Sequence, residues 1–297
     1  MFKKLLIFAL MIVGFFTPAN AQEQLYKIAP LDNMPILNKP SNEFGGALPV
    51  PQRDKQFRKY LSVSVKIKLP TSSGSGTIVY YDKEKNIAYV ASCGHFWTKG
   101  TSMSATDNKS KKVRCQVETW YHNDEKLPVS KTYEAKVVFY SYYDGQDTSL
   151  IIFTPDWEPD YYPIAPVDYK YNAGVHAHSI GSDHGGEVAH YDVEIVGFDV
   201  QGNDVITRKN SPRPGRSGGG LINEEGFYIA TCWGTQFEDG SGIGRFTSLK
   251  AIHKFWGQQK EYVFLLNIKK AVPFLPIVDR NNPQGTYTKD YVFLPKH

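Results

Sequence analysis

The segment from Gly215 to Gly219 reads Gly-Arg-Ser-Gly-Gly and contains the residue best suited to nucleophilic chemistry, Ser217. A serine between glycines in a tight turn can expose its hydroxyl while neighbouring backbone N–H groups converge on one point, which offers a nucleophile and an oxyanion hole. Because a serine hydroxyl is a poor nucleophile at neutral pH, it needs a base, commonly a histidine oriented by a carboxylate. His95 follows one apolar run and Asp147 opens another, so both groups are available.

Three separate blocks of sequence resemble the trypsin-like, chymotrypsin-fold serine peptidases, and most closely their bacterial exported, HtrA-like branch. A fourth, weaker block precedes the serine. Together the blocks cover roughly residues 60–257, about two-thirds of the chain, with the candidate residues in the order His95, Asp147, Ser217. The blocks are Gly74–Ile78 with Tyr89–His95, Asp147–Ile151, Ser211–Asn223 and the weaker Ala173–Gly186.

The resemblance implies a role for each residue of a catalytic triad. Ser217 would attack the scissile carbonyl, His95 would take its proton and return it to the leaving amine, and Asp147 would hold the imidazole tautomer. The backbone N–H groups of Gly215 and Ser217 would form the oxyanion hole. The expected reaction is hydrolysis of a polypeptide through an acyl-enzyme intermediate, with no cofactor and no metal.

The resemblance also implies substrate-binding residues near the serine. Cys232, Trp233 and Gly234 fall where the family has the Ser-Trp-Gly strand that pairs with the substrate backbone. Gly234 and Gly244 would be open walls of the specificity pocket, and Ser211 would lie near its base. Because position 211 is serine rather than aspartate, a preference for lysine or arginine is not supported.

Arg216 departs from trypsin itself, which has an acidic residue before the nucleophile. No Ile-Val-Gly-Gly start precedes the first strand, so activation by pairing of a freed amino terminus with that acid is not available. The HtrA-like enzymes lack this mechanism as well. The tail after Gly257 is forty residues long, too short for the peptide-binding domain of true HtrA proteins. Cys232 stands where a serine usually contacts the catalytic aspartate.

Short apolar or alternating runs bounded by Gly, Asn, Asp or Pro predict many β-strands. The first, Leu61–Leu69, alternates apolar and polar residues with a period of two. A Pro-rich connector at about 154–170 divides the strands into two groups of about six, which predicts an all-β fold of two six-stranded antiparallel barrels. The other expected strands are Gly76–Tyr81, Ile87–Ala91, Val113–Tyr121, Thr132–Tyr140, Ser149–Phe153, Val175–Ile180, Val188–Val196, Asp204–Thr207, Gly219–Ile222, Phe227–Trp233 and Ile243–Thr247.

One helix is expected at the C-terminal end of the second group of strands. Ser248 can cap it, and four apolar residues recur at helical spacing until Gly257 ends it. Two later apolar runs, Tyr262–Leu266 and Tyr291–Leu294, either add strands or wrap the domain.

Residues 1–21 have the features of a secretory signal peptide. Two lysines precede the apolar run Leu5–Phe16, which is too short to span a bilayer of about 30 Å. The small-residue ending predicts cleavage after Ala21 and a secreted or periplasmic protein without a stable membrane anchor. The Pro-rich residues 22–59 are expected to form an arm, residues 60–257 the peptidase domain and residues 258–297 a C-terminal extension.

Composition and charge exclude several other classes of protein. The chain is 41% hydrophobic and 14% aromatic, which excludes a disordered protein and favours β structure. The formal net charge is +4, and removal of the signal peptide leaves 32 basic and 30 acidic residues, a net charge of +2. This charge is too small to indicate binding to nucleic acid.

A group of four histidines makes a zinc site an alternative, because His-x-His on a strand puts two imidazoles on one face. The same stretch fits the weaker peptidase block, and no carboxylate or cysteine completes the set, so we expect hydrogen-bonded or solvated histidines. Asp144 is expected to be a turn residue rather than the acid of the triad. The histidines are His176, His178, His184 and His190.

Two further alternatives stay open at this point. One is a catalytically weak or inactive binding protein of the same fold, although such proteins usually lack a triad residue and none is missing here. The other concerns the cysteines. Cys93 and Cys232 flank the triad in the family pattern, so a disulfide between them is a hypothesis, and buried free thiols are the favoured reading.

Overall fold

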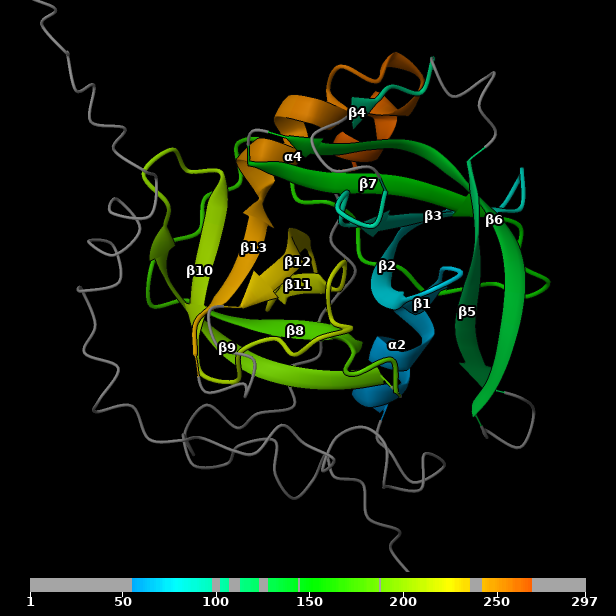
Figure 1. Cartoon of the computed structure of the whole chain (residues 1–297), viewed down its shortest axis with the longest axis horizontal. Helices are drawn as coiled ribbons and strands as arrows, with labels where there is room; N and C mark the ends of the chain where they lie inside the picture. The colour runs from blue at the N-terminus through cyan, green and yellow to red at the C-terminus, as the bar shows by residue number, and fades with distance from the viewer. Residues whose placement is uncertain are drawn as a thin grey trace, which may run out of the picture. The chain divides into compact units, whose positions relative to one another are not determined.

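The computed structural model describes residues 55–97, 102–106, 113–122, 128–143, 145–186, 188–235 and 242–268. The predicted signal peptide, the arm as far as residue 54, Asp144 and the tail from residue 269 lie outside these residues. The described chain consists mainly of strands in two groups, with an α-helix before the first group and another after the second (Figure 1). No helix in this part of the chain is long and apolar enough to cross a membrane.

The first group of strands forms a sheet that closes on itself. Its strands are β1 (Ser64–Lys68), β2 (Ser73–Asp82), β3 (Ile87–Ser92), β4 (Ser102–Met103), β5 (Arg114–His122), β6 (Pro128–Tyr143) and β7 (Gln146–Phe153). Six of them pair antiparallel around a ring in the order β1, β2, β3, β7, β6, β5, and β5 returns to β1. The remaining strand, β4, pairs with β6 outside the ring.

The second group of strands forms another closed antiparallel barrel. Its strands are β8 (His176–Ser182), β9 (Val188–Phe198), β10 (Asp204–Arg208), β11 (Gly220–Asn223), β12 (Tyr228–Thr235) and β13 (Gly244–Ser248). They follow one another around the barrel as β10, β13, β12, β11, β8, β9. The predicted all-β fold of two six-stranded antiparallel barrels is therefore confirmed.

The first strand begins three residues later than predicted, so the predicted start at Leu61 is wrong. Residues 61–63 end helix α2 (Lys55–Val63), and the strand begins only at Ser64. Tyr60 in this helix is buried, and its ring lies 4.2 Å from the ring of His190 in β9. The Ser64 hydroxyl donates to the carbonyl of Tyr60 and closes the last turn. Packing of Tyr60 against the second barrel thus overrides the alternating pattern.

Apolar side chains form two cores. One fills the first barrel with residues such as Ile67, Val90 and Ile151. The other begins inside the second barrel and continues across the interface to Phe139 and Leu150 of the first. The shared core packs the two barrels against each other, and the candidate site lies along this boundary.

Helix α4 (Leu249–Trp256) forms as predicted. The Ser248 side chain accepts from the N–H of Ala251, and Gly257 is the C-terminal cap. The helix follows the second barrel but packs on the first, where the Trp256 ring lies 5.2 Å from that of Phe139. The run Tyr262–Leu266 adds no strand, because it lies in the 3₁₀ helix η3 (Lys260–Leu266), whose aromatic residues pack on Tyr80 and Tyr89. The run at 291–294 lies outside the described residues.

The four histidines that suggested zinc are divided between different environments. His178 Nδ1 and His190 Nε2 lie 3.1 Å apart, so one buried ring donates a hydrogen bond to the other. His176 instead lies near the carboxylate of Asp192, at 3.6 Å. Burial lowers the pKa of His178 to about 4 and holds the pKa of His190 well below its ordinary value.

The buried histidine pair predicts a loss of stability in mild acid. In the unfolded chain each histidine takes up a proton near pH 6.5, whereas the folded protein resists protonation until the pH is far lower. The stabilisation is therefore complete above pH 6.5 and is lost as the pH falls toward 4. We expect His178 alone to lower the free energy of unfolding by about 2 kcal/mol between pH 7 and pH 5.

Urea denaturation of His178→Gln at the two pH values tests this expectation, because glutamine cannot take up the proton and the pH dependence should become shallower. His176→Gln is the matched control. The nearby carboxylate of Asp192 raises the pKa of His176, so replacing His176 should leave the loss of stability in acid unchanged or make it steeper. An equal pH dependence in the wild type and His178→Gln would contradict the prediction.

Candidate active site

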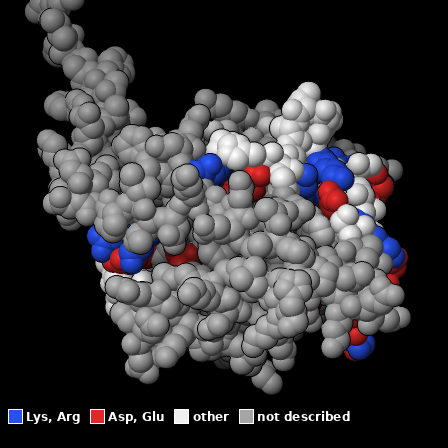
Figure 2. Space-filling view, turned by 90° about the horizontal axis from the view of Figure 1, so that it is seen from below, with Lys and Arg blue, Asp and Glu red and all other residues white. Residues whose placement is uncertain are grey.

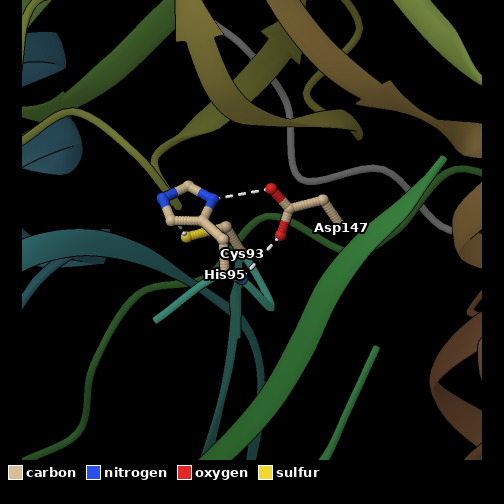
Figure 3. A group of neighbouring side chains, drawn as sticks. All are labelled: Cys93, His95 and Asp147. Atoms are coloured by element: carbon tan, nitrogen blue, oxygen red, sulfur yellow. Dashed lines mark hydrogen bonds and ion pairs between the residues drawn. The ribbon is translucent and has the colours of Figure 1, made fainter. Parts of the chain in front are cut away.

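The Asp147 carboxylate binds the His95 segment through both of its oxygens (Figure 3). Oδ2 lies 2.6 Å from His95 Nδ1, and Oδ1 accepts from the backbone N–H groups of Gly94 at 2.5 Å and His95 at 2.8 Å. The carboxylate therefore fixes the imidazole and the main chain that carries it. Because an ionised carboxylate only accepts hydrogen bonds, Nδ1 carries the proton and Nε2 is left as the basic nitrogen.

Neighbouring strands place these two residues together. His95 lies just beyond the end of β3, and Asp147 is the second residue of β7, which pairs with β3. The second barrel contributes as well, since the Thr247 hydroxyl donates to the carbonyl of Asp147 at 2.8 Å. Trp256 Nε1 donates to Thr148 Oγ1 at 3.0 Å, so helix α4 supports the same strand.

Cys93 lies on the other side of the imidazole. Its Sγ is 3.6 Å from His95 Nε2, and it is fully buried. Burial, with the nearby charge of Asp147 as a smaller cause, raises the pKa of the Cys93 thiol well above its ordinary value. All three cysteines are free and buried, so the hypothesis of a Cys93–Cys232 disulfide is wrong and the favoured reading of buried thiols is confirmed.

Among the described residues, Cys93, His95 and Asp147 form the one group of metal-ligating types whose ligand atoms all lie within 4.8 Å of one another. Their arrangement suits a hydrogen-bonded chain better than a metal site. Asp147 binds Nδ1, whereas the thiol faces Nε2, and these two ring nitrogens point in different directions. A single ion could not replace both contacts without rotating the ring.

The loop that carries Ser217 begins with a tight turn. Arg216 N donates to Arg213 O at 3.0 Å, and Gly215 has φ +93°, which makes residues 213–216 a type II turn with Pro214 at its second position. Within the described part of the chain, neither the N–H of Gly215 nor that of Ser217 donates a hydrogen bond. Both N–H groups, that of Gly215 and that of the serine itself, are therefore available to a bound group, which is one requirement of an oxyanion hole.

The structure brings His95 and Asp147 together, but it forms no hydrogen bond between His95 and Ser217 within the described residues. Ser217 is partly exposed, and its loop is held against the end of β3. A methyl group added at the next residue, Gly218, would lie 2.2 Å from Ser92 Oγ, three residues before His95. The other side of the loop is fixed by Cys232. Gly218 N donates to the carbonyl of Cys232, and Cys232 N donates to the carbonyl of Gly219.

The predicted substrate-binding residues lie in β12, β13 and the loop before the serine. A side chain added at Gly234 would meet open space, whereas one added at Gly244 would lie 2.5 Å from Thr207 Oγ1. Ser211 is fully buried, and its Oγ has no hydrogen-bond partner among the described residues. Trp233 is held in place through Nε1, which donates to Asp204 Oδ1 at 3.1 Å.

Two residues of the site were not predicted. Ser75 in β2 bonds to the serine loop through its backbone N–H, which donates to Ser217 O at 2.7 Å, and its hydroxyl, which donates to Gly215 O at 2.8 Å. Tyr142 in β6 lies with its ring 5.8 Å from that of His95. The small residues of Gly74-Ser-Gly76 indicate a close approach of two backbones and could have pointed to Ser75. Tyr142 has no such signal.

We expect Gly218→Ala to be more destabilising than Gly174→Ala, although both glycines have nearly the same positive φ. Gly218 has φ +87°, and its added methyl group would lie 2.0 Å from the carbonyl oxygen of Ser75. Gly174 has φ +88° and open space on that side. Gly174→Ala should therefore lower the free energy of unfolding by about 1–2 kcal/mol, the strain alone. Gly218→Ala should lower the free energy of unfolding by the same strain and by about 1–3 kcal/mol more, because the methyl group overpacks the loop. Urea denaturation of both variants checks this, and equal losses would contradict it.

Comparison with known proteins concerns the fold. No family model and no curated protein matches the sequence. The structure of human heparin binding protein is similar, with 14% sequence identity and a TM-score of 0.50 over 74% of this chain and 97% of that chain. A serine endoprotease from Yersinia pestis matches with 18% identity and a TM-score of 0.47 over 71% of this chain and 65% of that chain. The structure of Deg5 matches with 17% identity and a TM-score of 0.46 over 67% and 89%. With its two closed barrels and the likeness to the first of these structures, the chain has the fold of the trypsin-like serine peptidases.

Proposed function

We propose that the chain is an exported serine endopeptidase that hydrolyses peptide bonds through an acyl-enzyme on Ser217. The observation that carries this proposal is the 2.6 Å contact between Asp147 Oδ2 and His95 Nδ1. It commits Nδ1 to the carboxylate, so Nε2, which also lies 3.6 Å from Cys93 Sγ, is the ring nitrogen that would take up a proton. Nothing else among the described residues pairs a histidine and a buried carboxylate in this way beside a partly exposed serine.

In the proposed reaction Ser217 Oγ attacks the carbonyl carbon of a peptide bond while its proton passes to His95 Nε2. The carbonyl electron pair moves to the oxygen, which becomes an oxyanion. When the tetrahedral intermediate collapses, the C–N bond breaks and the proton passes from His95 to the leaving amine. Water then attacks the acyl-enzyme in the same way, with His95 again as the base, and releases the acid product and free Ser217.

The N–H groups of Gly215 and Ser217, which donate no hydrogen bond to another described residue, are the proposed stabilisers of the oxyanion. Preorganised donors of this kind contribute to rate because they need no rearrangement when the charge develops. Loss of one such donor typically lowers kcat about 10²–10³-fold. The Asp147 carboxylate would stabilise the imidazolium that forms at each proton transfer.

A non-catalytic binding function is the alternative, and one observation favours it. His95 Nε2 lies near Cys93 Sγ, and the hydrogen bond from Ser217 that the reaction needs is not formed in the described residues. Human heparin binding protein, of similar fold, bears the name of a binding protein. Catalytic hydrogen bonds are often long without substrate and shorten in its complex, so the peptidase remains our proposal.

The proposed substrate is a polypeptide rather than a nucleic acid. Where the described surface is visible in Figure 2, basic and acidic atoms lie side by side. Lysines on the surface pair with acids, as in Lys68 with Glu118 and Lys83 with Glu158. We place the protein outside the cytoplasm, because residues 1–21 have the features of a cleavable signal peptide.

Labelling with a fluorophosphonate probe tests the proposed nucleophile. We expect the purified wild-type protein to form a stable adduct, because attack on phosphorus uses the same serine, base and oxyanion hole. Ser217→Ala should lose the label completely, and His95→Ala should react at least about 10³-fold more slowly. The adduct is detected by gel fluorescence and located by mass spectrometry of the labelled peptide.

Cys93→Ala is the control for the neighbouring thiol and should keep the label. The assay is repeated over a range of pH and after limited proteolysis, because a cut in the predicted arm (residues 22–59) would release a cleft that the arm blocks. If no Ser217-dependent label forms under any of these conditions, the proposed peptidase activity is contradicted and the non-catalytic binding function is favoured.

Gly234→Val should impair substrate binding without affecting the fold. The space beside Gly234 is open, so if this glycine lines the substrate cleft, the added side chain would occupy room that the substrate needs. We expect kcat/KM for a cleaved peptide to fall about ten-fold or more. Gly197→Val in β9 is the matched control, because Gly197 also faces open space but belongs to a different strand, where it pairs with Ile206 of β10. Equal kcat/KM values of the two variants would contradict the prediction that Gly234 lines the substrate cleft.

A further inference from the structure

Arg216, the residue before the proposed nucleophile, is completely buried although it carries a charge. Its guanidinium lies over the ring of Tyr191, 3.8 Å from the ring centroid. Nη1 donates to the carbonyl oxygens of Ser179 at 3.0 Å and Ala189 at 3.3 Å. Nη2 is buried without a hydrogen-bond partner in the described part of the chain.

Asp183 supplies the opposite charge. Arg216 Nε donates to Asp183 Oδ1 at 2.7 Å, and the side chain of Asp183 is largely buried, with 14% of its surface exposed. Its other oxygen, Oδ2, accepts from the hydroxyl of Tyr191. The two charges therefore compensate each other inside the second barrel, where a single unpaired charge would be strongly unfavourable.

The turn that carries Asp183 also holds the main chain on the other side of Gly215. His184 N donates to Pro214 O at 2.5 Å, so the plane of the peptide between Pro214 and Gly215 is fixed by this bond. The N–H of Gly215 belongs to the same peptide. A methyl group on Gly215 would lie only 2.7 Å from Gly185 N, which shows how closely the turn and the loop approach.

The turn is itself anchored to the first barrel. Ser182 N donates to the Ser75 hydroxyl at 2.8 Å, and Lys66 Nζ donates to the carbonyl of Gly185. Residues 182–185 are therefore held in place from β1 and β2, and they in turn hold the serine loop at Pro214 and at Arg216. This chain of contacts joins an ion pair to both donors of the proposed oxyanion hole.

We propose that Asp183 and Arg216 are positioning residues, and that their buried ion pair holds the Gly215 and Ser217 N–H groups in the orientation that binds the oxyanion. The inference rests on the proposed function and goes beyond it, because neither residue touches the reacting atoms. Both partners belong to the described chain, so in this proposal the charge that orders the loop comes from Asp183 and not from a cleaved amino terminus.

The test uses the full chain with Asp183→Asn, Asp183→Asn/Arg216→Met and Glu194→Gln. Glu194→Gln is the matched control, because it removes the acid that pairs with Arg208 and Lys209 in the same barrel and has no hydrogen bond or ion pair to residues 213–219 in the described chain. The double variant keeps the test decisive if Asp183→Asn fails to fold. The double variant removes both charges and so leaves no charge buried without a partner, whereas Asp183→Asn alone leaves the charge of Arg216 unpaired, which is strongly destabilising. Thermal unfolding identifies the temperature range in which every variant is folded.

In that range kcat and KM are measured on a peptide that the wild type cleaves. We expect the single and double Asp183 variants to lose about 10²-fold or more in kcat, with KM changed less than about 3-fold, because the oxyanion forms only after binding. Glu194→Gln should keep the wild-type kcat. A folded double variant with wild-type kcat would overturn the proposal, since the pair would then serve stability alone.

Hydrogen exchange of residues 213–219 is measured on the same proteins and does not depend on activity. Exchange should become faster in both Asp183 variants and stay unchanged in Glu194→Gln. Unchanged exchange in the double variant would overturn the proposal even if the wild type proved inactive. If instead exchange accelerates but the wild type is never labelled by the fluorophosphonate, the proposed function fails while the positioning role of the ion pair stands.

Discussion

Ser75 bonds to the second barrel at three points, the carbonyls of Gly215 and Ser217 and the N–H of Ser182. Its own carbonyl accepts from the Ser92 hydroxyl, close to the histidine. The candidate base and acid lie on the first barrel and the candidate nucleophile on the second, so the site exists only if the barrels meet in one register. Apolar packing brings the barrels together but is not directional, and the hydrogen bonds of Ser75 supply the direction that packing lacks.

The same interface shows how charged groups can be buried without being left unpaired. Asp147 is bound by two backbone N–H groups and an imidazole, and Arg216 by a carboxylate and two carbonyls. Each charge is matched by partners from strands or turns that also carry candidate site residues. The contacts that stabilise these two buried charges therefore also set the geometry of the candidate site. A substitution that weakens one of these contacts is expected to disturb the shape of the site before it unfolds the domain.

Much of the architecture could be predicted from the sequence because it follows from local rules. Period-two strands, a proline-rich connector and a serine between glycines are visible in short windows of sequence, and they predicted the barrels and the candidate Ser217. Helix α2 was missed at Leu61 because burial of Tyr60 against the other barrel decides its conformation. The run at 262–266 has no clear period, so its 3₁₀ helix could not be distinguished from a strand. The pairing of Asp183 with Arg216 joins residues 33 positions apart, and no sequence rule connects them.

The buried Arg216–Asp183 pair has a consequence for how such a protein would be controlled. Peptidases that depend on a newly freed amino terminus are made inactive and are switched on at a chosen moment. If the ion pair has the proposed positioning role, a chain that contains both charges orders this loop when its two barrels fold together, so the loop itself needs no covalent event. If the chain is the exported peptidase proposed above, folding only after passage across the membrane would keep this ordered loop away from the proteins of the cytoplasm, so the host would be protected by the place where the protein folds.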